Sequence, residues 1–162
     1  MIHETTVRVR YPEVDRMGVV YHAHYLVYFE QGRTEFLRAF GRSYREVEET
    51  GVLLVVADAG LKFVRPARYD DVLVVRTRLV AASGVRLRFE YEVVRPSDGL
   101  LLATGHTTLA STDLEGRPTR LPDAMRAWVE SVAEGAAPAG GEAQADPAGK
   151  KSPSAVVQGK NP

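Results

Sequence analysis

The alternation of apolar and polar residues predicts one β-strand at the start of the chain and four more in its middle. Residues 3–10 alternate with period two, with Thr5, Val7 and Val9 on one side, as is typical of a half-buried strand. The later strand-like segments are residues 52–64, 71–81, 85–95 and 100–112. Turn sequences such as Ser83-Gly84 and Pro96-Ser97-Asp98-Gly99 separate them, which favours antiparallel strands joined by tight turns.

Residues 25–40 have the three-and-four spacing of an amphipathic helix. The apolar positions are Tyr25, Leu26, Tyr28, Phe29, Phe36, Leu37 and Phe40. Gly32 interrupts this stripe; it costs about 1 kcal/mol of helix propensity relative to alanine but lets another backbone pack closely. Gly41 is placed to end the helix, and Ser43 with Glu46 predicts a capping box at a second, short helical turn.

The end of the chain divides into two parts. Residues 122–134 predict a short helix with an inner side formed by Met125, Trp128, Val129 and Val132. Residues 135–162 are mostly Gly, Ala, Pro, Ser, Lys and Gln without periodicity, a composition that buries too little apolar surface to fold. We therefore expect one folded domain over residues 1–134 and a disordered tail over 135–162.

A strand, a long helix and four further strands indicate the α+β class, with one helix laid across a curled, five-stranded antiparallel sheet. One helix and one sheet leave an open sheet edge and an exposed face. Because such edges usually find a partner, we expect a homodimer at least.

Composition excludes several classes of function. Lys+Arg and Asp+Glu both number 21 in 162 residues, so no basic excess indicates a nucleic-acid partner. Cysteine is absent, which rules out disulfides and thiolate nucleophiles. The first ten residues lack the apolar run of a signal peptide, and no segment approaches the roughly 18 apolar residues of a membrane span. A cytoplasmic location is the default expectation.

The candidate chemistry lies in residues 11–28. Asp15 precedes Gly18, and His22 and His24 stand where the long helix is expected to begin. The free N–H groups and positive dipole end of a helix N-terminus attract a carbonyl oxygen that gains negative charge. This segment therefore predicts a reaction site.

A metal site is a weaker interpretation of the two histidines. Their rings share a face on a strand but not on a helix. No third histidine is near, since His106 lies on another predicted strand. The chain also has no glycine-rich phosphate-binding motif. We expect no metal ion.

The sequence D-x-x-G-V-V-Y-H-A of residues 15–23, with Tyr11, Glu13, Tyr25, Phe29-Glu30 and Arg33-Thr34-Glu35, resembles the hotdog-fold acyl-CoA thioesterases. The most similar type is the 4-hydroxybenzoyl-CoA thioesterase family, YbgC-like branch, and the resemblance covers residues 5–121. It implies a five-stranded sheet around one long helix, dimers with a continuous sheet, often dimers of dimers, and neither metal nor bound cofactor. One departure is His24, where the family commonly has Asn.

The resemblance implies roles for individual residues. Asp15 is expected to act as general base or as nucleophile, with the capping of a turn as the alternative. A backbone N–H near His22 is expected to hold the thioester carbonyl. The His22 ring is expected to orient the thioester or to assist Asp15, with propping of the loop as the alternative. Substrate contacts are expected from Tyr11, Tyr21 and Tyr25, with core packing as the alternative for Tyr11. Lys62, Arg65 and Arg68 are expected to bind coenzyme A phosphates, unless they form a solvated turn.

The function predicted from these residues is hydrolysis of an acyl-CoA to the free acid and CoA. Two alternatives stay open. The first is a non-catalytic acyl-CoA-binding regulator built on the same fold, and the second is a hydratase acting on the acyl chain.

Overall fold

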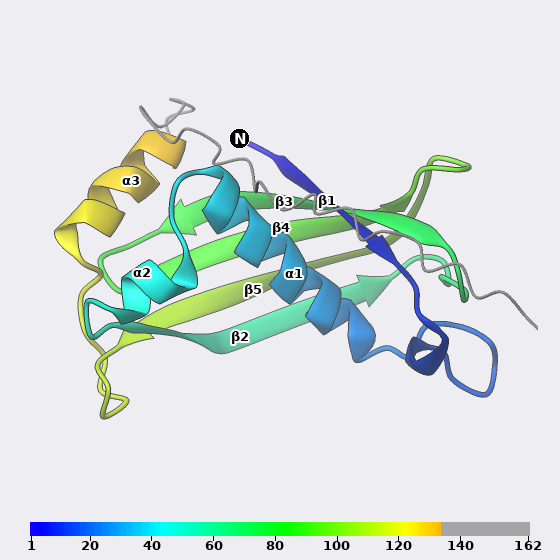
Figure 1. Ribbon diagram of the computed structural model, residues 1–162, viewed down its shortest axis with the longest axis horizontal. Coiled ribbons are helices and arrows are strands. Elements are labelled where there is room, and N and C mark those ends of the chain that lie inside the picture. The colour runs from blue at the N-terminus through cyan, green and yellow to red at the C-terminus, as the bar shows by residue number, and fades with distance from the viewer. Residues whose placement is uncertain (134–162) are drawn as a thin grey trace, which may run out of the picture.

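The computed structural model describes residues 1–133, and the predicted tail of residues 135–162 lies outside them. One five-stranded antiparallel sheet has the strand order β1-β3-β4-β5-β2, and helix α1 crosses one of its faces (Figure 1). The strands are β1 (His3–Arg8), β2 (Leu53–Phe63), β3 (Val72–Ala82), β4 (Arg86–Arg95) and β5 (Leu100–Thr112). The helices are the 3₁₀ turn η1 (Tyr11–Glu13), α1 (His24–Ala39), α2 (Tyr44–Glu48) and α3 (Asp123–Ala133). The predicted α+β architecture is confirmed.

The residues expected to end α1 and to begin α2 are found in these positions. Gly41 follows α1 with a φ of +79°, a left-handed angle that glycine adopts without strain. At α2 the N–H of Glu46 donates to Ser43 Oγ at 3.3 Å, and the N–H of Ser43 donates to Glu46 Oε2 at 2.6 Å. This reciprocal pair is the predicted capping box.

Helix α1 lies unusually close to the sheet at two glycines. A Cβ on Gly32 would stand 2.5 Å from Thr77 Oγ1, and a Cβ on Gly105 would stand 2.4 Å from Phe29 Cε2. The Phe29 ring stacks on Tyr91 with centroids 4.3 Å apart. Gly32 does allow close packing, but its neighbours are the side chains of Thr77 and Val75 and not the predicted backbone, and neither glycine leaves room for a methyl group.

Strand β2 contains a β-bulge that changes which side chains face the helix. Val56 pairs with Leu109 and Asp58 pairs with Thr108, so Ala57 is the extra residue. Side chains of a strand alternate between faces. After the bulge Leu61 packs against the core, and Lys62 consequently faces the other side of the sheet.

Helix α3 closes the end of the sheet that lies farthest from the start of α1 (Figure 1). The predicted inner residues Met125, Trp128, Val129 and Val132 are buried, and Trp128 Nε1 donates to the carbonyl oxygen of Phe40 at 2.6 Å. Within residues 1–133, no helix has the length and apolar character that crossing a bilayer requires.

Candidate active site

Asp15 sits on a narrow hairpin made by residues 13–21. The N–H of Tyr21 donates to the carbonyl oxygen of Glu13 and the N–H of Asp15 donates to that of Val19, both at 2.9 Å. Val14 and Val20 form an antiparallel bridge between these two bonds. Gly18 makes the return with a φ of +73°, as its position in the sequence predicts. The hairpin therefore fixes the register of the segment that carries the candidate acid.

The Asp15 carboxylate caps its own turn and also faces a hollow. Its Oδ1 accepts the N–H of Met17 at 2.8 Å, so the capping contact is present. Among residues 1–133, Oδ2 has no hydrogen-bond partner. Asp15 lines a hollow of about 340 Å³ together with His22 and Tyr25. Together with Arg65, which also lines the hollow, the structure thus brings four of the predicted site residues to one place.

The start of α1 leaves backbone donors open beside this hollow. The N–H groups of His24, Tyr25 and Leu26 donate to the carbonyl oxygens of Tyr21, His22 and Ala23. The N-cap residue Ala23 has no side-chain cap. Within the described part of the chain, the N–H groups of His22 and Ala23 have no acceptor. Free N–H groups at a helix start attract anions and developing negative charge.

The far wall of the hollow is the last residue of β2 with the segment that follows it. It contributes Phe63, Val64, Arg65 and Pro66, and the hairpin adds Met17, Val19 and Val20. Sequence reasoning did not identify these apolar residues as site residues, because periodicity shows which face of a strand is buried but not which loop the end of the strand will meet.

Tyr25 lines the hollow with its ring and holds the far wall with its hydroxyl. It is 2% exposed, and its ring stands edge-on to Phe63 at 5.3 Å. The phenol oxygen accepts the N–H of Ala67 at 3.3 Å, while the carbonyl oxygen of Ala67 accepts the N–H of Val20 at 2.9 Å. Burial raises the pKa of the Tyr25 phenol. The hydroxyl is therefore a neutral structural contact between α1, the hairpin and the far wall.

The other predicted aromatic residues do not line the hollow. Tyr21 is 46% exposed and packs beside the His22 ring, with centroids 4.2 Å apart. Tyr11 is 76% exposed and stands edge-on to Tyr69, so the core-packing alternative for Tyr11 is wrong. His24 is half-buried and lies edge-on to Tyr21. In the described residues no group of three or more His, Asp or Glu side chains is arranged to hold a metal ion.

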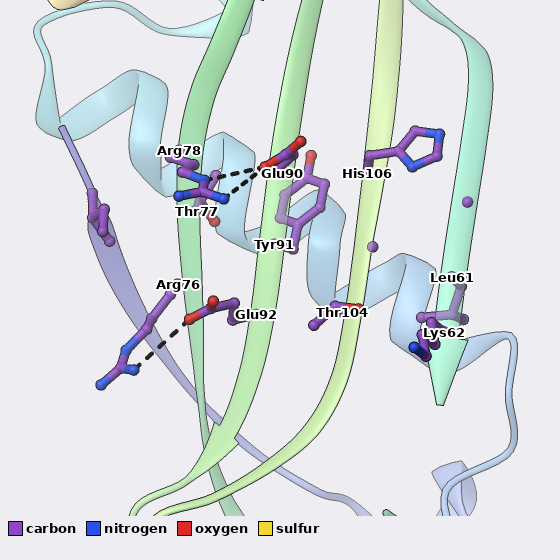
Figure 2. A pocket seen from close by; sticks show the side chains of 13 residues that line it. Leu61, Lys62, Arg76, Thr77, Arg78, Glu90, Tyr91, Glu92, Thr104 and His106 are labelled. Carbon is purple, nitrogen blue, oxygen red and sulfur yellow. Dashed lines mark hydrogen bonds and ion pairs between the residues drawn. The ribbon is translucent and has the colours of Figure 1, made fainter. Parts of the chain in front are cut away.

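Of the three predicted cations, Arg65 lines the hollow, Arg68 lies near the hairpin at Gly18, and Lys62 lies elsewhere. Arg65 lines the hollow, and Arg68 Nη1 lies 4.0 Å from the point where a Cβ on Gly18 would stand. In residues 1–133 neither guanidinium has a carboxylate within 4.0 Å. Lys62 instead lines a separate hollow of about 430 Å³ on the outer face of the sheet (Figure 2). The predicted cluster of three is therefore split by the alternation of β2.

The outer hollow differs from the first in its electrostatics. Its two arginines are paired with carboxylates, Arg78 with Glu90 at 2.8 Å and Arg76 with Glu92 at 3.9 Å (Figure 2). Paired charges attract an anionic ligand less strongly than free ones. The candidate site is therefore the smaller hollow, which is lined by Asp15 and the unpaired Arg65.

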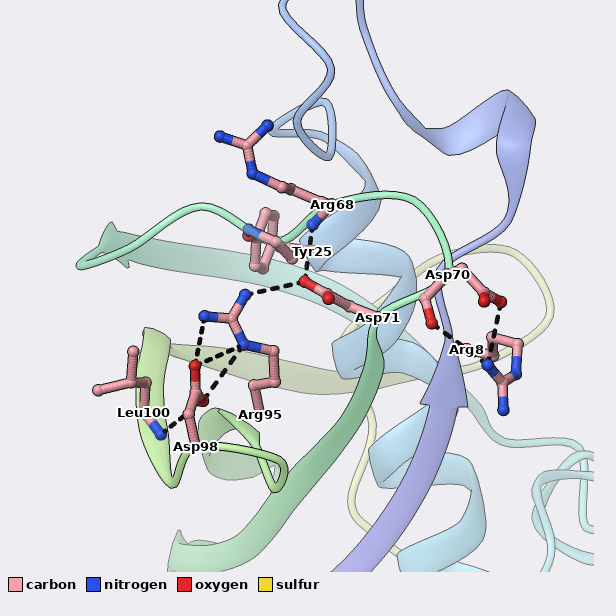
Figure 3. A network of polar contacts seen from close by, with 9 residues as sticks. Arg8, Tyr25, Arg68, Asp70, Asp71, Arg95, Asp98 and Leu100 are labelled. Atoms are coloured by element: carbon pink, nitrogen blue, oxygen red, sulfur yellow. Dashed lines mark hydrogen bonds and ion pairs between the residues drawn. The ribbon is translucent and has the colours of Figure 1, made fainter.

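A polar network fixes the backbone on which Arg68 stands. Asp71 Oδ2 accepts the backbone N–H of Arg68 at 2.9 Å and Arg95 Nη1 at 3.0 Å (Figure 3). Arg95 also pairs with Asp98 at 2.7 Å, and the hydrogen bonds that it donates to Asp98 and then to Asp71 raise the pKa of its guanidinium. The Arg68 side chain points away from this network (Figure 3), which leaves its charge available.

Comparison with known proteins identifies the family. The chain matches the model of the thioesterase-like superfamily over residues 9–129, and it belongs to that superfamily. It is 34% identical over 123 residues to the acyl-CoA thioesterase YbgC of Haemophilus influenzae, covering 75% of this chain and 89% of that protein.

Solved structures agree with this assignment. A hypothetical protein from Thermus thermophilus is 40% identical with a TM-score of 0.76, covering 82% of this chain and 98% of that one. A DHNA-CoA thioesterase from Staphylococcus aureus is 29% identical with a TM-score of 0.76, covering 82% of this chain and 89% of that one. The fold is the hotdog fold, the protein is an enzyme of the thioesterase class, and the resemblance described from the sequence is confirmed.

Proposed function

We propose that this protein hydrolyses acyl-CoA thioesters to the free acid and CoA, with Asp15 as general base or nucleophile. One observation carries the proposal: Asp15 and His22 line the same apolar-walled hollow, and within residues 1–133 the N–H groups of His22 and the adjacent Ala23 have no acceptor. Thioester hydrolysis needs an activated water or a nucleophile, and donors for the carbonyl oxygen as it gains charge. In this proposal Asp15 meets the first requirement and the two N–H groups meet the second.

As a general base, Asp15 takes a proton from water while the water attacks the thioester carbon. As a nucleophile, it forms a mixed anhydride that water then hydrolyses. In both routes the carbonyl oxygen gains negative charge beside the N–H groups of His22 and Ala23, and the dipole of α1 favours that charge. The His22 ring lines the hollow and orients the thioester.

The proposed substrate contacts divide by chemistry. The apolar wall formed by Val19, Phe63 and Val64 receives the acyl group, and the unpaired guanidinium groups of Arg65 and Arg68 bind CoA phosphates. The Staphylococcus aureus structure is named for an aromatic thioester, so we include aromatic as well as short aliphatic acyl groups among the proposed substrates.

The test is Asp15→Asn, assayed on a panel of short and aromatic acyl-CoAs. Asparagine keeps an oxygen that accepts the Met17 N–H but removes the negative charge, so the turn cap is preserved while the base is lost. We expect kcat to fall by about 100-fold or more without a large change in melting temperature. Asp70→Asn is the matched control, because Asp70 is exposed and pairs with Arg8. An Asp15→Asn enzyme with the wild-type rate would contradict the mechanism.

The alternative function is a non-catalytic acyl-CoA-binding regulator. It predicts no turnover of any acyl-CoA in the panel although binding is retained. Calorimetric titration with a non-hydrolysable thioether analogue measures the binding, and the turnover assay then separates the regulator from the enzyme. A cytoplasmic location stays a prediction from the sequence.

The proposal includes a homodimer, assembled further as a dimer of dimers. Strand β2 is an edge of the sheet, and its Val55 and Val56 are 42% and 50% exposed. Long, exposed apolar edge strands are uncommon in monomers because they pair with other chains. Sedimentation equilibrium tests this: a protein that is monomeric at micromolar concentration would contradict it.

A further inference from the structure

Glu13 is a buried carboxylate that the proposed reaction does not use. It is 2% exposed and ends the 3₁₀ turn η1. A buried charge persists only where hydrogen bonds and ion pairs compensate its lost hydration. Here Oε2 accepts the N–H of Arg10 and the hydroxyl of Tyr28, and Oε1 accepts Arg10 Nε, all at 2.8 Å. Glu13 is one of the residues that carry the family resemblance, but the resemblance implies no role for it.

The backbone of Glu13 begins the hairpin that carries Asp15. Its carbonyl oxygen accepts the N–H of Tyr21, the residue just before His22. Asp15 follows two residues after Glu13, and its N–H donates to the carbonyl oxygen of Val19. A displacement of Glu13 would therefore move both the candidate acid and the entry into α1.

Tyr28 anchors this hairpin to the helix. It lies in α1 with a relative exposure of 0%, so its hydroxyl has no access to solvent. Hydrogen bonds to a charged acceptor are stronger than bonds between neutral groups. The Glu13–Tyr28 contact thus joins the element bearing Asp15 to the element bearing the free N–H groups.

We propose that Glu13 and Tyr28 are positioning residues, which hold the Asp15 carboxylate at its working distance from the N–H groups of His22 and Ala23. The inference rests on the proposed function. Neither side chain lines the hollow with Asp15, so both act through the hairpin and not on the substrate.

The test is Tyr28→Phe, which removes one oxygen and keeps the ring. A misplacement of about 1 Å in a reaction site costs up to about 100-fold in rate; we expect kcat to fall roughly 10- to 100-fold. KM should change by less than about threefold, because a contact that aligns the reacting groups acts mainly in the transition state. The far wall with Arg65 and Phe63 does not depend on this phenol.

Tyr91→Phe is the matched control. Tyr91 is also 2% exposed, and its hydroxyl shares a 2.6 Å hydrogen bond with Thr107 in the sheet, away from the hairpin. Removing its oxygen also loses a buried hydrogen bond, one between neutral groups, so the melting temperature should fall in both variants. Only Tyr28→Phe should lower kcat at a temperature well below either transition.

A double variant tests whether Tyr28 acts through Asp15. If it does, Asp15→Asn/Tyr28→Phe should be no slower than Asp15→Asn alone. Once the Asp15 carboxylate has been removed, a shift in its position cannot lower kcat further. Tyr28→Phe with wild-type kcat, or a double variant slower by the full single effect, would overturn the positioning role alone. An Asp15→Asn enzyme with full activity would overturn the proposed mechanism and this inference together.

Discussion

Gly105→Ala tests how closely α1 is seated on the sheet. A Cβ at this position would lie 2.4 Å from Phe29 Cε2 and 2.5 Å from the carbonyl oxygen of Gly60. Atoms cannot remain at such distances, and the carbonyl oxygen belongs to the β2–β5 ladder, where Leu61 pairs with Gly105. The Phe29 ring must therefore move, and α1 with it.

The size of the effect follows from two opposing terms. Overpacking a core costs about 1–3 kcal/mol, and the severity of both contacts points to the upper end. Alanine in place of glycine in a strand returns roughly 0.5–1 kcal/mol, because the unfolded chain is less flexible. We expect a net loss of about 2 kcal/mol, which lowers the melting temperature by roughly 4–8 °C in a chain of this size.

Gly60→Ala is the control on the neighbouring strand. Its Cβ would lie 2.3 Å from the ring of His106, but that ring is a half-buried side chain on the outer face and is free to rotate. The cost is the 2.9 Å contact between His106 and Asp58, an exposed pair worth at most about 1 kcal/mol. We expect a change within about 0.5 kcal/mol. Thermal and urea unfolding measure both variants, and equal destabilisation of the two would refute the packing argument.

Two further predictions concern charge. Arg65→Ala and Arg68→Ala should each raise KM for acyl-CoA several-fold with little change in kcat. Added salt should reduce the difference in KM from wild type, because salt screens exposed charges. Steady-state kinetics at two salt concentrations check this, and unchanged KM values would exclude both residues as phosphate contacts. Burial alone would raise the pKa of Glu13, but hydrogen bonds from Arg10 and Tyr28 outweigh it and hold that pKa below 4.5. A carboxylate whose pKa is lowered by folding stabilises the protein at pH values above its unfolded-state pKa, and this stability is lost as the pH falls through its folded-state pKa. The difference in unfolding free energy between wild type and Glu13→Gln should therefore be full near pH 7 and should become smaller below pH 4.5 in urea titrations. A difference that does not depend on pH would contradict this.

Local patterns in the sequence predicted most of the fold, because the relevant interactions lie close together along the chain. The helix stripe, the Ser43–Glu46 capping box and the turn before Leu100 each depend on neighbours within a few residues. Each predicted boundary falls within two residues of the observed one. Asp15 and His22 could also be predicted to share one site, because they lie seven residues apart on and just after one hairpin.

The parts that sequence reasoning missed depend on contacts between distant segments. Phe63 and Val64 meet the hairpin through the sheet, and no spacing rule links them to Asp15. Lys62 was grouped with Arg65 because they are near in sequence, but β2 directs Lys62 to the outer face. Tyr11 was expected at the substrate or in the core, yet η1 turns it toward Tyr69 and solvent.

The bulge at Ala57 determines on which face of the sheet each later side chain of β2 lies. If Ala57 were instead taken into the ladder opposite Thr108, every later residue of β2 would move by one pairing position and its side chain would turn to the opposite face of the sheet. Lys62 would then enter the apolar wall of the hollow and Phe63 would stand among the ion pairs outside. A single unpaired residue therefore decides that the two surfaces of the sheet keep different chemistries.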